Sequence, residues 1–137
     1  MTPPADVLTF VVSTLQASPL CVSVTVIQEK VFSNEQFVLK VRAQLTNEWS
    51  LQIYLYHNHG HYDYAYQVFG VGALMRWDNK EDCPGLDNYP HHFHPVNGAP
   101  VTSPLTGEPV ADLPAVLENL KKIIAPAVPR PGLRKVR

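Results

Sequence analysis

Hydrophobic and polar residues alternate with a period of two from Leu20 to Val68, and this pattern limits the possible folds more than any other feature of the chain. A period of two is typical of β-strands, in which successive side chains point to opposite faces. Short polar segments at residues 33–35, 46–48 and 58–60 separate the alternating runs and indicate turns. We therefore predict four or more strands joined by short turns, as in an antiparallel meander.

Two segments with helical periodicity flank the strands. Hydrophobic residues at helical spacing predict one helix over residues 3–17. A second predicted helix begins with Asp112 as its cap and has Pro114 in its first turn. We expect the α+β fold class: an antiparallel β-sheet of four to six strands packed with an N-terminal and a C-terminal helix, in a single domain over residues 1–127.

The segment between the last predicted strand and the second helix is rich in proline and glycine. Nine of the 13 prolines lie at or beyond Pro90, and we expect residues 80–111 to form a long irregular loop with a functional role. Gly70 and Gly72 are expected to bend the strand that precedes this loop. Residues 128–137 contain basic but no acidic side chains, which predicts a flexible basic tail.

Charge and hydropathy exclude several classes of protein. The net charge of −1 gives no overall field of the kind that makes a protein a general binder of nucleic acid or membrane surfaces. No apolar run approaches the ~20 residues of a membrane span, and the N-terminus lacks the pattern of a signal peptide. Cys21 and Cys83 lie too far apart to indicate a cysteine-rich zinc motif. We expect a cytoplasmic protein with two free thiols and no membrane association.

All six histidines lie in two short clusters. The first cluster surrounds the predicted turn between two strands, and the second follows Tyr89-Pro90 in the long loop. The first consists of His57, His59 and His61, and the second of His91, His92 and His94. Such clustering marks both segments as candidate sites.

Three interpretations of the histidines are open. Converging clusters could bind a zinc or nickel ion, with Asp63 or Asp78 as a further ligand. Without a metal, two histidines in different environments could act as general base and general acid, which suits cleavage of RNA through its 2′-hydroxyl. In the third interpretation the turn histidines are solvated and the loop histidines only bond backbone carbonyls.

The segment Arg76-Trp77-Asp78-Asn79 is the second candidate source of chemistry. In a strand, Arg76 and Asp78 point to the same side, where they could form an ion pair or bind a ligand together. An arginine can bind phosphate through two N–H groups, so Arg76 is a candidate phosphate ligand.

Five tyrosines lie on two neighbouring predicted strands: Tyr54, Tyr56, Tyr62, Tyr64 and Tyr66. We interpret them as core or half-buried partners across the strands. The alternative is a stacking platform for RNA bases, in which Tyr66 would contact the substrate.

The two segments together resemble a known family. Arg76-Trp77-Asp78-Asn79, followed by Tyr89-Pro90-His91-His92-Phe93-His94, is similar to the two sequence boxes of the TumE-like toxins. The resemblance covers roughly residues 50–125, and Arg76, Asp78, Asn79, His92 and His94 match the boxes. Many family members have a further Pro-His pair after the first box, whereas residues 80–84 contain no histidine.

The resemblance implies the toxin component of a type II toxin–antitoxin system, neutralised by a cognate antitoxin protein. We expect an endoribonuclease that uses no cofactor or metal, with RNA as the substrate and a homodimer as a possible assembly. The expected catalytic residues are His92, His94, Arg76 and Asp78, and the expected substrate-binding residues are Asn79, His91 and Tyr66.

Two functions other than ribonuclease activity are also considered. One is a non-catalytic binding or regulatory protein with a histidine-based metal or anion site. The other is a purely structural role, in which Arg76 and Asp78 pair with loop histidines and fix the loop to the sheet.

Overall fold

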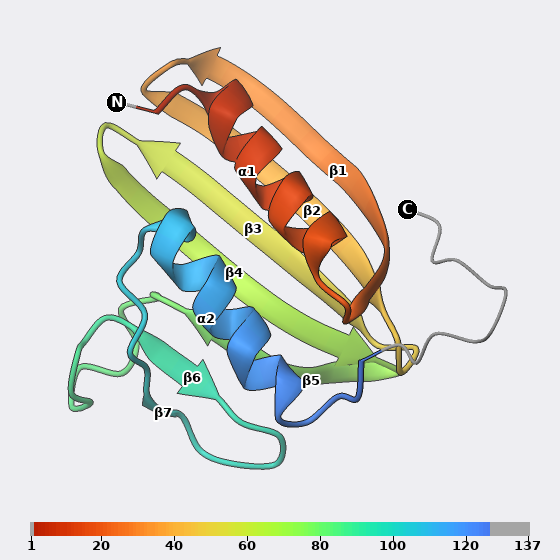
Figure 1. Cartoon of the computed structure of the whole chain (residues 1–137). Coiled ribbons are helices and arrows are strands. Elements are labelled where there is room, and N and C mark those ends of the chain that lie inside the picture. Colours follow the sequence, from red (N-terminus) through yellow and green to blue (C-terminus); the bar gives the residue numbers. More distant parts are fainter. Residues whose placement is uncertain (1, 127–137) are drawn as a thin grey trace, which may run out of the picture.

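Each strand of the sheet pairs with the next strand along the chain. The links between the first five strands are short enough to form hairpins, and the links that precede the sixth and seventh strands are longer. The computed structural model describes residues 2–126, which form seven antiparallel strands and two helices (Figure 1). In chain order the elements are α1 (Pro4–Ala17), β1 (Cys21–Ser33), β2 (Gln36–Leu45), β3 (Ser50–Asn58), β4 (His61–Gly70), β5 (Gly72–Asp78), β6 (His92–His94), β7 (Val101–Thr102) and α2 (Pro109–Lys121). The α+β class and the meander are confirmed, and the strand count exceeds the predicted four to six.

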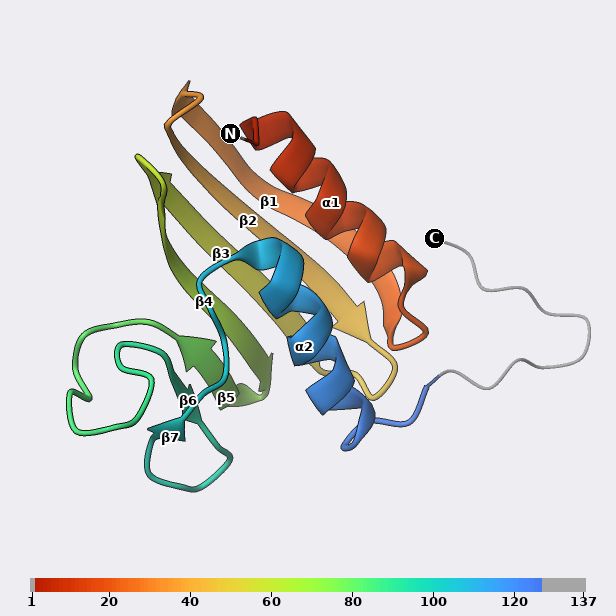
Figure 2. The same ribbon diagram turned by 60° about the vertical axis from the view of Figure 1, so that its left-hand side comes forward.

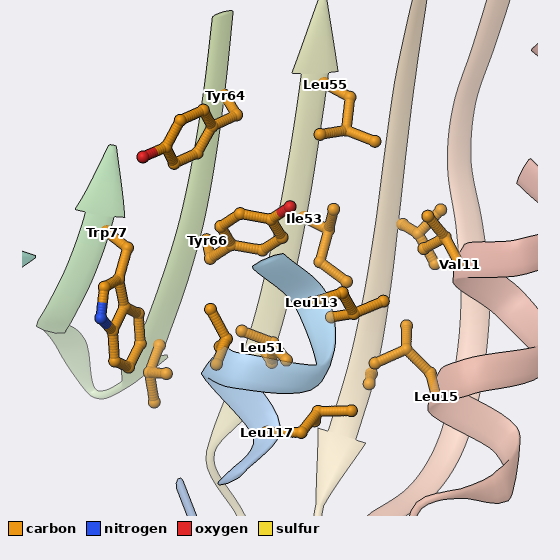
Figure 3. Packing of buried hydrophobic residues seen from close by; sticks show 14 of the residues in the cluster. Val11, Leu15, Leu51, Ile53, Leu55, Tyr64, Tyr66, Trp77, Leu113 and Leu117 are labelled. Carbon is orange, nitrogen blue, oxygen red and sulfur yellow. The ribbon is translucent and has the colours of Figure 1, made fainter. Parts of the chain in front are cut away.

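Both helices pack on one face of the sheet, α1 nearer β1 and β2 and α2 nearer β4 and β5 (Figures 1 and 2). The alternation of the sequence supplies this core, since every second residue of β2, β3 and β4 is buried. In Figure 3 the ring of Tyr66 lies beside α2, near Leu113 and Ile53. Neither helix covers the other side of the sheet, which we call the open face (Figure 2).

The first helix matches its prediction and the second starts earlier than predicted. Helix α1 buries Val7, Val11 and Leu15 at helical spacing, as expected for a helix over residues 3–17. Helix α2 begins at Pro109 with Glu108 as its cap residue, so the prediction that Asp112 caps it is wrong.

Asp112 is buried in the first turn of α2 and binds the preceding loop instead. Its Oδ1 accepts hydrogen bonds from the backbone N–H and the hydroxyl of Thr106, both at 2.9 Å, and its Oδ2 accepts one from the N–H of Gly107 at 2.7 Å. A carboxylate near the start of a helix also complements the helix dipole. Asp112 therefore does mark the N-terminus of this helix, but from within its first turn and not from the cap position.

Two further predictions about the chain are corrected. Gly70 and Gly72 do not bend one strand but flank the turn between β4 and β5, where Gly72 has a positive φ of 105°. The loop predicted over residues 80–111 contains the two short strands β6 and β7.

The predicted basic tail over residues 128–137 lies outside the described residues. Within residues 2–126, neither helix has the length and hydrophobicity of a membrane span.

Candidate functional site

The pairing of β5 with β6 brings the two sequence boxes together. Arg76 lies opposite His94, and Asp78 lies opposite His92. Residues directly opposite each other in an antiparallel pair point to the same side of the sheet. The ring of Trp77 packs on that of Phe93 on the side of the core, with centroids 4.6 Å apart. The register therefore gathers four candidate catalytic side chains on the open face.

Asp78 is the centre of this cluster and is only 1% exposed. Its Oδ2 accepts a hydrogen bond from Nε of Arg76, which confirms the predicted ion pair. Its Oδ1 accepts the backbone N–H of Lys80 at 3.1 Å. The two carboxylate oxygens also lie near the histidines, Oδ1 at 2.9 Å from Nε2 of His92 and Oδ2 at 3.6 Å from Nε2 of His94. Asp78 can thus fix the positions of all three neighbours.

Arg76 and His94 form the accessible part of the cluster, with side chains 33% and 27% exposed. Nη2 of Arg76 lies 3.2 Å from Nε2 of His94 and donates a hydrogen bond to it when the ring is neutral. Burial, followed by the positive charge of Arg76, lowers the pKa of His94 below its ordinary value of 6.5. The ring is therefore neutral at pH 7 and carries a basic nitrogen beside a guanidinium.

A cavity of about 200 Å³ adjoins Arg76 and His94. Its lining residues are Gln67, Ala73, Leu74, Met75, Arg76 and His94. The two exposed members of the cluster therefore face a space that a ligand can enter from the open face.

His92 is the buried member of the cluster, with 1% of its surface exposed. Its Nδ1 lies 3.0 Å from the carbonyl oxygen of Pro90, to which it donates a hydrogen bond. Its Nε2 points toward two carboxylates, Oδ1 of Asp78 at 2.9 Å and Oδ1 of Asp82 at 3.4 Å. Asp82 was not among the residues that the sequence singled out, because a single acidic residue in a loop carries no distinctive signal.

Within residues 2–126, two sets of side chains have the composition and spacing to hold a metal ion. One set is Asp78, His92 and His94, and the other is Asp82, Cys83 and His92. In each set the ligand atoms lie within 4.8 Å of one another. His92 belongs to both sets.

Asn79 and His91, expected to bind substrate, make structural contacts. The amide of Asn79 accepts the backbone N–H of Tyr64 at 3.0 Å and donates to the carbonyl of Tyr62 at 2.8 Å, so it extends the attachment of β5 to β4. His91 lies on the helix side of the sheet, where its Nδ1 is 2.9 Å from the hydroxyl of Tyr64. Burial lowers the pKa of His91 and raises that of Tyr64.

The five tyrosines are divided between the two faces of the sheet. Tyr62, Tyr64 and Tyr66 are buried on the core face, and Tyr66 is only 1% exposed. A stacking platform requires exposed rings, so we leave Tyr66 out of the proposed site. Tyr54 and Tyr56 lie on the open face and are partly exposed, as their alternation with buried Ile53 and Leu55 in the sequence already indicates.

The first histidine cluster does not join the second. His57 is buried against Phe37, with ring centroids 4.8 Å apart, and its Nδ1 lies 3.0 Å from the carbonyl oxygen of Glu35. His59 and His61 are exposed at the turn between β3 and β4. Among residues 2–126, no histidine of this first cluster belongs to a set of side chains spaced to hold a metal ion, so the two clusters do not meet at one ion.

The comparisons with known proteins agree with the resemblance carried by the two boxes. The family model described as Toxin TumE matches residues 11–125 of this chain. No curated protein and no solved structure matches it. The match covers both boxes, the strands β1 to β7, the whole of α2 and the second half of α1. The chain therefore belongs to the TumE toxin family.

Proposed function

We propose that this toxin is an endoribonuclease whose active centre is the cluster on β5 and β6. The observation that carries the proposal is the register that sets Arg76 beside His94, next to a cavity on the open face. A guanidinium paired with a neutral imidazole can bind a phosphodiester and remove a proton from a neighbouring hydroxyl. RNA supplies both groups in every nucleotide.

In the proposed reaction, Arg76 binds the oxygens of the phosphodiester. The N–H that it donates to His94 in the free protein then goes to the phosphate, which frees Nε2 of His94. His94 takes the proton of the 2′-hydroxyl while the 2′ oxygen forms a bond to phosphorus. The bond from phosphorus to the 5′ oxygen breaks, and that oxygen takes a proton from water. The products are a 2′,3′-cyclic phosphate and a 5′-hydroxyl end.

Asp78 and His92 act in this proposal as positioning residues. Both are 1% exposed, so neither reaches a ligand in the cavity directly. Asp78 holds the guanidinium of Arg76 through Nε, which leaves the outer N–H groups for phosphate. Of the two histidines expected to transfer protons, only His94 has the exposure that this role requires.

The open face offers a path for the strand of RNA on either side of the cluster. Strand pairing places Arg42, Gln52, Gln67, Arg76 and His94 in one row across the sheet. A second row holds Lys40, Tyr54, Ala65, Asp78 and His92. At the ordinary strand spacing, the two arginine positions are about 14 Å apart. Two arginines in one row and the ring of Tyr54 in the neighbouring row suit a short single strand.

The partner and the cellular setting follow from the family. We propose that a cognate antitoxin protein neutralises the chain. The homodimer and the cytoplasmic location stay predictions, and size-exclusion chromatography of the purified protein tests the first of them.

The proposed chemistry is tested with purified protein and a single-stranded RNA, compared with the same strand carrying 2′-O-methyl groups. We expect cleavage of the unmodified strand alone, with 2′,3′-cyclic phosphate ends. His94→Ala should lower the rate by roughly 10²–10⁴-fold, whereas His59→Ala, at an exposed turn, should not change it. Cleavage of the 2′-O-methyl strand, or full activity of His94→Ala, would contradict the proposed mechanism.

A further inference from the structure

Nε2 of His92 is a buried polar atom without a hydrogen-bond partner among residues 2–126. It lies 2.9 Å from Oδ1 of Asp78, but the angles are not those of a hydrogen bond. Nδ1 of the same ring donates to the carbonyl of Pro90, so in the neutral ring Nε2 carries a lone pair. A buried lone pair facing carboxylate oxygens is unfavourable unless a proton or a cation lies between them.

The ring of His92 is held as a metal-binding histidine usually is. Such a histidine donates its second ring N–H to a carbonyl or carboxylate, which fixes the ring and directs the other nitrogen to the ion. The carbonyl of Pro90 provides this contact at 3.0 Å.

The distances around Nε2 match those between ligands of one ion. Two ligand atoms that each lie about 2.1 Å from a metal are about 3.0–3.4 Å apart in octahedral or tetrahedral geometry. The distance from Nε2 of His92 to Oδ1 of Asp82 is 3.4 Å, within this range. The ligand atoms of Asp82, Cys83 and His92 also lie within 4.8 Å of one another.

Hydrogen bonding distinguishes this side of the cluster from the side with His94. Nε2 of His94 lies 3.2 Å from Nη2 of Arg76, and Nε of the same guanidinium donates a hydrogen bond to Oδ2 of Asp78. On that side the guanidinium of Arg76 already supplies a positive charge to both Asp78 and His94. On the other side of the carboxylate, Oδ1 of Asp78 meets the unpartnered Nε2 of His92 and the loop carboxylate of Asp82.

We propose that His92, Asp82 and the thiol of Cys83 bind a divalent transition-metal ion of the zinc class, next to the carboxylate of Asp78. An imidazole and a thiol beside carboxylates favour zinc or cobalt over magnesium and calcium, which prefer oxygen ligands alone. The ion ties the loop after β5 to β6 and leaves Arg76 and His94 available to a substrate. The site does not depend on the proposed ribonuclease activity, and it replaces the expectation of a metal-free cluster.

The test measures zinc binding by untagged, full-length protein after chelator treatment, using isothermal titration calorimetry. Asp82→Asn is the main variant, because the Asp82 side chain is 57% exposed and its loss spares the core. Asp87→Asn is the matched control, an exposed carboxylate in the same loop. His92→Gln is a second variant, with circular dichroism to verify folding. Cobalt substituted for zinc reports ligation by Cys83 through a thiolate charge-transfer band, which Cys83→Ser removes.

We expect near-stoichiometric zinc binding by the parent and by Asp87→Asn, and at least ~10-fold weaker binding by Asp82→Asn. Folded His92→Gln should also bind weakly. Absence of zinc binding by the parent, or equal affinity of the parent and Asp82→Asn, overturns the proposal. Each of these results is independent of RNA cleavage, so the metal site and the proposed function can fail separately.

Discussion

Arg76 and Asp78 lie two residues apart on one face of β5, and Nε of the guanidinium donates a hydrogen bond to Oδ2 of the carboxylate. Each of these two side chains also contacts a histidine of β6: Arg76 contacts His94, and Asp78 contacts His92. The cluster therefore joins two strands through side chains as well as through the backbone. Its stability and its chemistry both depend on the buried carboxylate.

Replacement of Asp78 tests this dependence. In Asp78→Asn the guanidinium of Arg76 loses its buried anionic partner, and we expect the free energy of unfolding to fall by about 2–4 kcal/mol. Urea denaturation followed by circular dichroism measures this change. The control is Asp63→Asn on the same face, whose side chain is 59% exposed and pairs with exposed His61. A change in the control as large as that in Asp78→Asn would show that the burial of Asp78 is not the cause.

Replacement of Arg76 separates positive charge from hydrogen-bond geometry. Lysine keeps the charge but cannot donate to Asp78, His94 and phosphate together, so Arg76→Lys should cleave RNA at least ~10-fold more slowly. Arg76→Ala should lose roughly 10²–10³-fold, as expected when a donor to the phosphate is removed. Initial rates on one RNA substrate measure both effects. Wild-type activity of Arg76→Lys would show that charge alone is sufficient.

The division of the tyrosines between two faces predicts opposite effects of two similar substitutions. Tyr66→Ala removes a core ring beside α2 and should lower the free energy of unfolding by about 3–5 kcal/mol. Tyr54→Ala, on the open face, should lower it by less than ~1 kcal/mol and weaken RNA binding roughly tenfold, because base stacking on one ring is lost. Thermal unfolding and fluorescence anisotropy with a labelled RNA measure the two quantities. Unchanged RNA binding by Tyr54→Ala would show that RNA does not cross the open face at Tyr54, in the row of side chains that also holds Lys40.

The strands β2, β3 and β4 and the helix α1 could be predicted because one face of each is buried. Phe37, Leu39 and Val41 are all buried on β2, and the residues between them are not, so the sequence pattern and the burial pattern agree. The same rule assigns Tyr54 to the open face and Tyr66 to the core. Local alternation was sufficient at these positions.

The site itself could be predicted only in part. The ion pair of Arg76 and Asp78 follows from a spacing of two residues in a strand. The partnership with β6 does not, because three residues from His92 to His94 are too few to show a period. Asp82 approaches His92 through the path of a loop, which local sequence does not specify. The resemblance of the two boxes to the toxin family was what grouped Arg76 and Asp78 with His92 and His94 as candidates, which the alternation of hydrophobic and polar residues could not do.

Induced expression of the wild type beside His94→Ala and His59→Ala, with growth and the integrity of total RNA followed together, tests whether His94 is required for RNA cleavage in the cell. We expect growth arrest with RNA cleavage for the wild type and for His59→Ala. For His94→Ala we expect normal growth and intact RNA at equal protein levels. Growth arrest by the wild type with intact RNA, or arrest by His94→Ala equal to that of the wild type, would contradict the proposed function.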